Sequence, residues 1–167
     1  MIKIYTVLFC LFFFNLSAEI VQRLDVKGNN RISNETIKVY GDITIGKDYS
    51  AFEVDEVLKK LFNTNFFEDI KISLVNNSLN ITVKEYAVIN FIDLEGEESN
   101  TVKTKILEEL NLKVKESFIS NKLSEDINLI KKIYSTLGFN FVSVESQIEK
   151  FDDSRVNLIY ILDKGKK

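Results

Sequence analysis

The chain has 167 residues, of which 45% are hydrophobic and 28% are charged, and it contains no His, no Pro and a single Cys. The absence of imidazole excludes Ser-His-Asp triads, Cys-His pairs and His-zinc sites. The net charge of −3 argues against nucleic acid as a partner, because phosphate binding requires a basic surface that releases counterions. The length fits one ordinary domain or two small ones.

Residues 1–18 read MIKIYTVLFCLFFFNLSA, with one early cation, a long apolar run and a short polar end. This pattern predicts a secretory signal peptide that is cleaved after Ala18, since the apolar run is shorter than the roughly 20 residues that span a bilayer. The alternative, a buried N-terminal helix, would be apolar all round. Cys10 leaves with the signal, so the exported remainder has no thiol and depends on its core for stability.

The remaining chain contains one pattern twice. The segment Val21–Gly28 aligns with Ile89–Gly96, and both alternate apolar and polar residues before a Gly. Such alternation is typical of a half-buried strand followed by a turn. Farther along, Leu79–Val83 aligns with Val156–Tyr160 at a larger spacing. We therefore expect two units with the same plan and unequal lengths.

In the first unit, Ser33 and Gly41 bracket a short predicted helix at residues 33–40. The capping box formed by Ser50 and Glu53 begins a second helix. Its apolar face follows helical spacing and consists of Val54, Val57, Leu58, Leu61 and Phe62. Alternating residues then predict a hairpin with strands at 70–74 and 79–83 and a turn at 76–78.

The second unit repeats this order. We expect a strand at residues 88–94, helices at 101–110 and 121–137, and a hairpin with strands at 141–148 and 155–162. Three strands per unit can cover a single helical layer. The predicted fold class is α+β, with two tandem β-α-α-β-β modules, each a three-stranded mixed sheet covered by two helices on one face. The short join at residues 84–87 lacks Gly and predicts a stiff tandem.

This pattern resembles the polypeptide-transport-associated (POTRA) domains of the BamA family of outer-membrane assembly factors in Gram-negative bacteria. The resemblance is carried by Val26–Ile32 with Glu35–Ile37, Leu61–Ile70, Tyr134–Phe139 and Arg155–Leu158. The chain departs from the family at Asn65, where Gly is common, and at Gly96-Glu97, where Gly-Asn is usual. The resemblance implies a first POTRA domain at residues 19–86 and a second at residues 87–165, behind the signal peptide at residues 1–18.

The resemblance also implies a location and partners. The family continues through further POTRA units into an outer-membrane β-barrel, whereas this sequence stops at Lys167, so we expect either a fragment of a longer protein or a protein without its own pore. The implied location is the periplasm, with attachment to the outer membrane through a barrel absent from this chain. The implied partners are unfolded outer-membrane protein precursors and accessory lipoproteins. An alternative is the POTRA pair of a two-partner secretion or translocation-and-assembly transporter.

Three further motifs suggest chemistry, and each has a simpler structural interpretation. Residues 41–48 have the Gly and Lys spacing of a phosphate-binding loop, but Asp48 stands where a hydroxyl must hold magnesium. The cluster Phe62, Phe66 and Phe67 is expected to seal the core. There are three acidic pairs, namely Glu97-Glu98, Glu108-Glu109 and Asp152-Asp153. They are expected to be solvated, which disfavours a small secreted hydrolase. We therefore expect no enzyme activity, no cofactor and no metal.

The sheet edges are the positive candidates. An edge strand presents unpaired N–H and C=O groups to which an extended segment of another protein can add. Such pairing is largely blind to sequence, which suits many unfolded β-rich clients. We expect the first strand of each hairpin to bind peptide, with the candidate residues Ile70, Lys71, Ile72, Ser73, Leu74, Val142, Val144, Ser146 and Ile148. Lys71 and Glu145 are expected to guard these edges against self-association.

Overall fold

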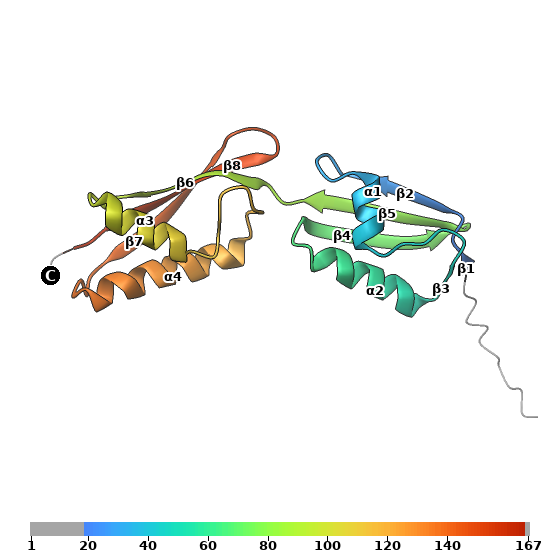
Figure 1. The fold of residues 1–167 in the computed structure, drawn as a ribbon, viewed down its shortest axis with the longest axis horizontal. Coiled ribbons are helices and arrows are strands. Elements are labelled where there is room, and N and C mark those ends of the chain that lie inside the picture. The colour runs from blue at the N-terminus through green and yellow to red at the C-terminus, as the bar shows by residue number, and fades with distance from the viewer. Residues whose placement is uncertain (1–18, 166–167) are drawn as a thin grey trace, which may run out of the picture.

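The computed structural model describes residues 19–165, so the expected signal peptide lies outside the described residues. Two units follow each other along the long axis and are joined between strands β5 (Ser78–Glu85) and β6 (Val88–Glu95) (Figure 1). Each unit has a three-stranded sheet with its helices on one face, which confirms the predicted α+β class. Among the helices within residues 19–165, none is long and apolar enough to cross a membrane.

The first unit contains one mixed sheet and one small antiparallel pair. Its elements are β1 (Glu19–Ile20), β2 (Arg23–Lys27), α1 (Asn34–Tyr40), β3 (Asp48–Tyr49), α2 (Ala51–Phe62), β4 (Phe67–Val75) and β5. The sheet order is β2-β5-β4, with β5 parallel to β2 and antiparallel to β4. The pairing of β1 with β3 is a feature that the sequence patterns did not predict.

The second unit repeats the same topology. Its elements are β6, α3 (Asn100–Glu109), α4 (Ser120–Thr136), β7 (Ser143–Lys150) and β8 (Arg155–Asp163). The sheet order is β6-β8-β7, with β8 parallel to β6 and antiparallel to β7. In both units the strand that comes last in the chain is therefore central in its sheet, and the first strand of the hairpin is an edge.

The predicted helix starts are confirmed by their hydrogen bonds. The side chain of Ser33 accepts a hydrogen bond from the N–H of Thr36 at 3.1 Å. The backbone N–H of Ser50 donates to the Glu53 carboxylate at 2.8 Å, while the Ser50 hydroxyl accepts from the N–H of Glu53. Each contact satisfies an N–H group that the first turn of a helix leaves free.

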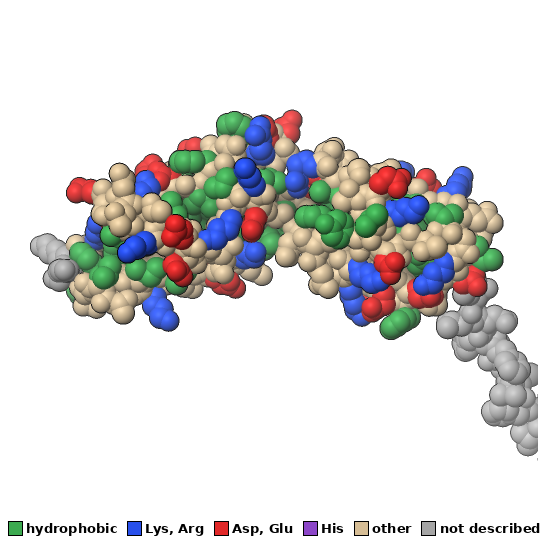
Figure 2. Space-filling model, in the orientation of Figure 1, with side chains coloured by type: hydrophobic (Ala, Val, Ile, Leu, Met, Phe, Trp, Pro, Cys, Tyr) green, Lys and Arg blue, Asp and Glu red, His purple; other side chains and the backbone are tan. Residues whose placement is uncertain are grey.

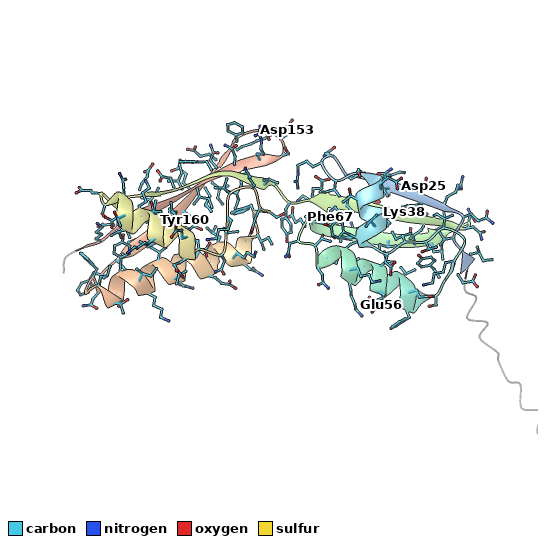
Figure 3. All side chains as sticks on the ribbon, in the orientation of Figure 1. Asp25, Lys38, Glu56, Phe67, Asp153 and Tyr160 are labelled. Carbon is cyan, nitrogen blue, oxygen red and sulfur yellow. The ribbon has the colours of Figure 1, made fainter. Side chains whose placement is uncertain are left out.

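Each sheet packs against its helices around its own hydrophobic core, and no buried residue is common to the two cores. Figure 3 shows Tyr160 between the second sheet and its helices, and this side chain is fully buried. The expectation for the aromatic cluster is met only in part. Phe67 is buried and Phe66 packs against the core, but Phe62 is 41% exposed because it lies at the end of α2.

Two glycines mark equivalent places in the two units. Gly28 and Gly96 follow the first strand of their sheets, with φ values of +83° and +85°. A Cβ atom would lie 2.1 Å from the carbonyl oxygen of Val83 at Gly28, and 2.0 Å from that of Leu162 at Gly96. Only glycine permits both the positive φ and so close an approach of two backbones.

These contacts make Val83 equivalent to Leu162, and the sheet register then makes Leu79 equivalent to Leu158. The sequence alignment that pairs Leu79 with Val156 is therefore wrong. The first hairpin turns tightly through residues 76–77, whereas the second turns through the longer loop at 151–154. The extra loop residues shift the true equivalence along β8.

Candidate peptide-binding edges

Strand β4 is an edge strand, as predicted for residues 70–74. It pairs with β5 and with no other strand in the described chain. Asn76 and Asn77 form the turn, and both have positive φ values, of 51° and 60°. Two left-handed residues in a two-residue loop are the signature of a type I′ turn, which sets the register of the hairpin.

This register decides which backbone groups of β4 face outward. Val75 and Ser78 close the turn, so in the alternating pattern of an antiparallel pair they exchange hydrogen bonds. Every second residue from Val75 then bonds to β5, which includes Lys71 and Ser73. The N–H and C=O groups that face outward belong to the three residues between them, namely Ile70, Ile72 and Leu74.

Strand β7 is the corresponding edge of the second sheet. The N–H of Phe151 donates to the carbonyl oxygen of Arg155 at 3.0 Å, which fixes the alternation from the loop inward. Among the candidate residues, the outward N–H and C=O groups then belong to Val144, Ser146 and Ile148.

Val142 is not part of this edge. Strand β7 begins at Ser143, and Val142 precedes it and packs partly buried against the second core. The predicted start was wrong because Val142 and Phe139 pack against the second core rather than extend the ladder. The structure therefore places eight of the nine candidate residues on the two edge strands.

The side chains of the outward-facing residues point toward the helices. Ile70 and Val144 are buried, Ile72 and Leu74 are partly buried, and Ile148 is 46% exposed near the hairpin loop. Lys71 and Ser73 lie on the opposite, open face of the sheet and are exposed. Lys71 stands 3.6 Å from Asp69, and both side chains are well exposed.

The other edge of the second sheet is partly closed, which sequence reasoning missed. The N–H of Ile89 donates to the carbonyl oxygen of Glu116 at 2.9 Å, and the N–H of Lys115 donates to the carbonyl oxygen of Ile89 at 2.8 Å. The N–H of Phe118 donates to the carbonyl oxygen of Ala87 at 2.8 Å. The loop between α3 and α4 thus covers the start of β6, and β7 is left as the open edge along its whole length.

A buried carboxylate fastens this loop. Asp126 on α4 is fully buried and accepts hydrogen bonds from the N–H groups of Asn111 at 2.6 Å and Leu112 at 3.0 Å. The hydroxyl of Tyr160 donates to the same carboxylate at 3.0 Å. Burial and the neighbouring Asp126 carboxylate both raise the pKa of Tyr160. The contacts fix the loop to both the helix and the sheet.

A second buried carboxylate corrects a sequence expectation. Glu97 was predicted to be solvated, but its side chain is only 6% exposed. Burial alone would raise its pKa, yet the Tyr134 hydroxyl, the N–H of Ser99 and the Lys164 ammonium lower it to about 2. The N–H of Ser99 donates at 2.9 Å, and the ammonium of Lys164 lies at 2.9 Å. Burial and Glu97 together raise the pKa of Tyr134.

The other acidic pairs lie at the surface, as expected. Glu98, Glu108, Glu109 and Asp153 are exposed, and Figure 3 shows Asp153 at the tip of the β7–β8 hairpin. Asp152 pairs with Arg155 at 2.6 Å, and hydrogen bonds from Arg155 and Ser154 lower its pKa to about 2. Across residues 19–165 there is no group of three His, Cys, Asp or Glu side chains placed to hold a metal ion.

The segment at residues 41–48 connects helix α1 to strand β3 rather than forming a phosphate site. Gly41 caps α1 with its N–H bonded to Ile37, and Ile43 is buried in the first core. The ammonium of Lys47 lies 3.2 Å from the Glu53 carboxylate. The lysine that a phosphate loop would need is therefore engaged in an ion pair.

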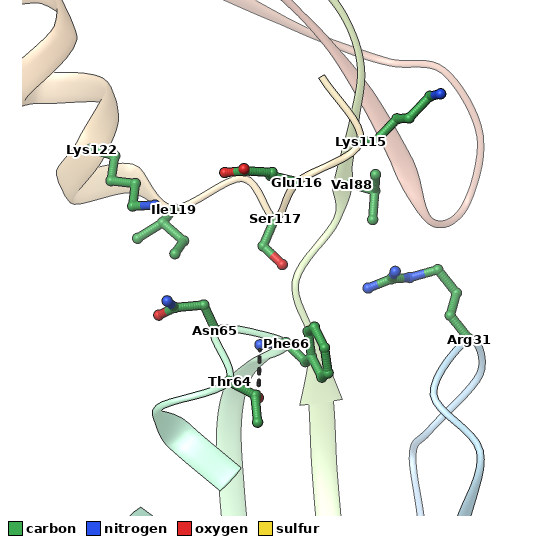
Figure 4. Close-up of a pocket in the computed structure, with 10 residues that line it drawn as sticks. All are labelled: Arg31, Thr64, Asn65, Phe66, Val88, Lys115, Glu116, Ser117, Ile119 and Lys122. Carbon is green, nitrogen blue, oxygen red and sulfur yellow. Dashed lines mark hydrogen bonds between the residues drawn. The ribbon is translucent and has the colours of Figure 1, made fainter. Parts of the chain in front are cut away.

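A cavity of about 330 Å³ lies between the two units (Figure 4). Thr64, Asn65 and Phe66 line it from the first unit, and the N–H of Phe66 donates to the Thr64 hydroxyl at 3.2 Å. Three cationic residues from the two units also line the cavity, namely Arg31, Lys115 and Lys122, together with the acidic residue Glu116. On the face shown in Figure 2, charged side chains of both signs alternate over the two units without a field of one sign.

The connection between the units is held to the first unit by hydrogen bonds and an ion pair. The N–H of Tyr86 donates to the carbonyl oxygen of Phe66 at 2.9 Å, and the Arg31 guanidinium donates to that of Tyr86 at 3.1 Å. The Glu85 carboxylate pairs with Arg31 at 3.2 Å and is only 7% exposed. It also accepts from the N–H of Ile32 at 2.9 Å. The segment predicted to be stiff is therefore anchored at its entry.

Comparison with known proteins agrees with this topology. The family model of POTRA, described as "Surface antigen variable number repeat", matches residues 87–165. The chain contains a POTRA domain. The POTRA match covers the unit in which β6, β7 and β8 form the sheet, and it confirms the resemblance drawn from the sequence.

The curated relatives that the chain matches are outer-membrane protein assembly factors named BamA. The chain is 24% identical over 148 residues to BamA of Neisseria meningitidis serogroup B, covering 87% of this chain and 19% of that protein. It is 28% identical over 183 residues to BamA of Buchnera aphidicola subsp. Acyrthosiphon pisum, covering 97% of this chain and 30% of that protein. The chain thus spans less than a third of either relative.

A solved structure resembles this chain in fold over both units. The N-terminal domain of Omp85 from the thermophilic cyanobacterium Thermosynechococcus elongatus matches with a TM-score of 0.53 and 16% identity. The match covers 86% of this chain and 63% of that chain. At this identity the likeness concerns the fold alone, and it covers both units.

Proposed function

We propose that this chain is a periplasmic POTRA scaffold of an outer-membrane protein assembly machine. In this proposal residues 1–18 are the export signal, residues 19–86 and 87–165 are two POTRA domains, and the scaffold is not an enzyme. It binds unfolded precursors of outer-membrane proteins, and accessory lipoproteins, by strand addition. The family match, the BamA relatives and the fold support the scaffold.

The observation that carries the proposal is the pair of open antiparallel edges. On β4 and β7, alternate residues direct both N–H and C=O outward, and no strand of the described chain pairs with them. A client strand can form a regular ladder with these groups whatever its side chains are. An assembly factor that receives many different barrel precursors needs this kind of recognition.

The two buried carboxylates support a scaffold rather than a hydrolase. Glu97 is engaged by Tyr134, Ser99 and Lys164, and Asp126 is engaged by backbone N–H groups and Tyr160. A carboxylate whose oxygens are all bonded within the protein holds structure and does not present itself to a substrate. General acid–base catalysis by carboxylates would instead require two carboxylates that face one cleft and are available to a substrate.

Proline substitution tests strand addition directly. A Pro at Ile72 or at Val144 removes an outward N–H and leaves the ladder to the central strand intact. Each lost client hydrogen bond costs about 1 kcal/mol, and a proline ring also bends the edge, so we expect roughly tenfold weaker binding. The assay measures photo-crosslinking of an unfolded outer-membrane protein precursor to the purified protein, with circular dichroism as the check on folding.

Leu24 on β2 provides the matched control. The N–H of Arg23 donates to Asn77, so the alternation of the strand directs the N–H of Leu24 away from β5. Leu24→Pro therefore removes an outward N–H at the opposite edge of the same sheet. The proposal predicts weaker crosslinking for Ile72→Pro or Val144→Pro and not for Leu24→Pro. Unchanged crosslinking in both edge variants with an intact fold would refute it.

A further inference from the structure

The second sheet has an unusual open face. Both sheets are covered by helices on one side, and on the uncovered side of the second sheet lie Phe91 from β6 and Ile159 and Ile161 from β8. Phe91 is 48% exposed and Ile161 is 37% exposed, while Ile159 is half-buried. Phe91 pairs with Asn157, whose next neighbour on that face of β8 is Ile159. The three side chains thus form one apolar group.

The first sheet provides an internal comparison. The glycine contacts and the strand register make Phe91 equivalent to Arg23. By the same register Ile159 is equivalent to Asn80, and Ile161 to Thr82. The same fold therefore tolerates polar side chains at all three positions, so the apolar residues of the second sheet are not needed to build it. Exposed apolar groups that the fold does not require mark an interaction surface.

The charges around this face are also reversed between the units. Ile161 pairs with Glu95 on β6 and with Glu145 on β7. Its equivalent Thr82 pairs with Lys27 on β2 and with Lys71 on β4. Within the described chain, neither Glu95 nor Glu145 forms an ion pair. The apolar group of the second sheet is thus bordered by acidic groups that are available to a partner.

We propose that the open face formed by Phe91, Ile159 and Ile161, with Glu95 and Glu145 at its border, docks a basic amphipathic segment of another protein. Such a segment carries Lys or Arg beside a row of apolar side chains, so it covers the apolar group and meets the acids with opposite charge. The docking uses side chains on the face of the sheet, whereas strand addition uses the backbone at its edge.

A second copy of this chain fits the face poorly. If two copies met through the same face, the Glu95 and Glu145 carboxylates of both copies would be brought together, and like charges in contact oppose association. The open face of the first sheet carries Lys27 and Lys71 beside Thr82, but at the equivalent positions it offers Arg23, Asn80 and Thr82 rather than apolar side chains. The charge pattern therefore favours a different, basic protein.

The test uses two synthetic helical peptides of equal length with the same leucine stripe, one with lysine and one with glutamate on the polar face. Each is titrated into the ¹⁵N-labelled protein and followed by amide chemical shifts. We expect the lysine peptide to shift the amides around Ile159 and Ile161, and the glutamate peptide to leave them unchanged. The triple variant Phe91→Arg, Ile159→Asn and Ile161→Thr carries the residues of the first sheet, and we expect it to bind the lysine peptide at least about tenfold more weakly.

Ile72→Pro serves as the control, since it changes the first sheet edge and leaves the docking face untouched, so it should bind the lysine peptide as the unchanged protein does. The inference is overturned if the lysine peptide shifts other regions, if the glutamate peptide binds equally well, or if the triple variant binds unchanged. It is also overturned if sedimentation shows that the protein associates with itself and the triple variant does not. Strand addition is tested by crosslinking of an unfolded precursor to the edge variants, and docking is tested by the peptide titration. Failure of one proposal is therefore distinguishable from failure of the other.

Discussion

Replacing Glu97 by Gln probes the electrostatic contribution of a buried carboxylate to the stability of the second unit. The Ser99 N–H and the Tyr134 hydroxyl donate to different oxygens of Glu97, so the variant keeps one acceptor oxygen, replaces the other by an amide NH2 group and removes the charge that pairs with Lys164. The side chain is 6% exposed, so solvent screens this pair little. We therefore expect a loss of stability that depends on pH in a defined way.

The magnitude follows from the pKa of Glu97, which folding lowers from 4.5 to about 2. A difference of this size corresponds to about 3 kcal/mol of stability. Because the folded pKa lies below the unfolded one, this stability is fully present above pH 4.5 and is lost as the pH falls toward 2. At pH 7 Glu97→Gln should thus be less stable than the unchanged protein by up to about 3 kcal/mol, and near pH 2 the two should converge.

The assay is urea unfolding at pH 7, 4 and 2.5, followed by the NMR signals of the buried core residues Leu158 and Leu79. Leu158 reports on the second unit, and Leu79 is the internal control in the first. The reasoning is refuted if the difference between Glu97→Gln and the unchanged protein at Leu158 does not shrink as the pH falls. It is also refuted if Leu79 responds as strongly as Leu158.

Further substitutions test the backbone contacts and the second buried carboxylate. Gly28→Ala and Gly96→Ala should each destabilise their own unit by more than about 2 kcal/mol, because a Cβ would overlap a carbonyl oxygen and the φ values are positive. Gly46→Ala has a φ of +87° and nothing within 4 Å, so urea unfolding should show only the backbone cost of about 1–2 kcal/mol; equal losses at all three would contradict the overlap. Asp126→Asn turns an acceptor into a donor among buried N–H groups and should lower stability by about 2–4 kcal/mol in the same assay, whereas a loss below 1 kcal/mol would show that the loop is held by other contacts.

The fold was predictable where local signals and packing agree. Ser33, Ser50 and Gly41 mark helix ends by hydrogen bonds that are local in the chain, so the helices are confirmed nearly residue by residue. The short pair of β1 and β3 depends on contacts between distant segments that carry no periodicity, and patterning did not find it. The prediction that Val142 belongs to β7 was wrong, because periodicity alone does not distinguish an apolar residue that precedes a strand from one within it.

The candidate site, like the fold, was predictable from the sequence only in part. Alternation along the chain and a turn at residues 76–77 suffice to place β4 at an edge, but the outward-facing groups of Ile72 and Leu74 follow only from the register of the hairpin. The burial of Glu97 depends on Tyr134 and Lys164, which are remote in sequence. Sequence position alone could not distinguish it from a solvated acid.

One signal for the docking face was present in the sequence. The run from Val156 to Leu162 is apolar at every position except Asn157 and therefore reads as a strand buried on both faces. A two-layer unit covers its sheet on one face, so part of that run has to be exposed. The structure shows that Ile159 and Ile161 are the residues left uncovered by helices.

The most direct measurement of the central claim is amide hydrogen exchange at the two edges, with and without an unfolded outer-membrane protein precursor. Strand addition predicts that bound precursor slows exchange at outward-facing N–H groups, at Ile72 and Leu74 on β4 or at Val144 and Ser146 on β7, while the control amide of Leu24 on β2 is unchanged. If the precursor binds and protects only helix amides, or leaves both edges exchanging as before, strand addition at these edges is contradicted.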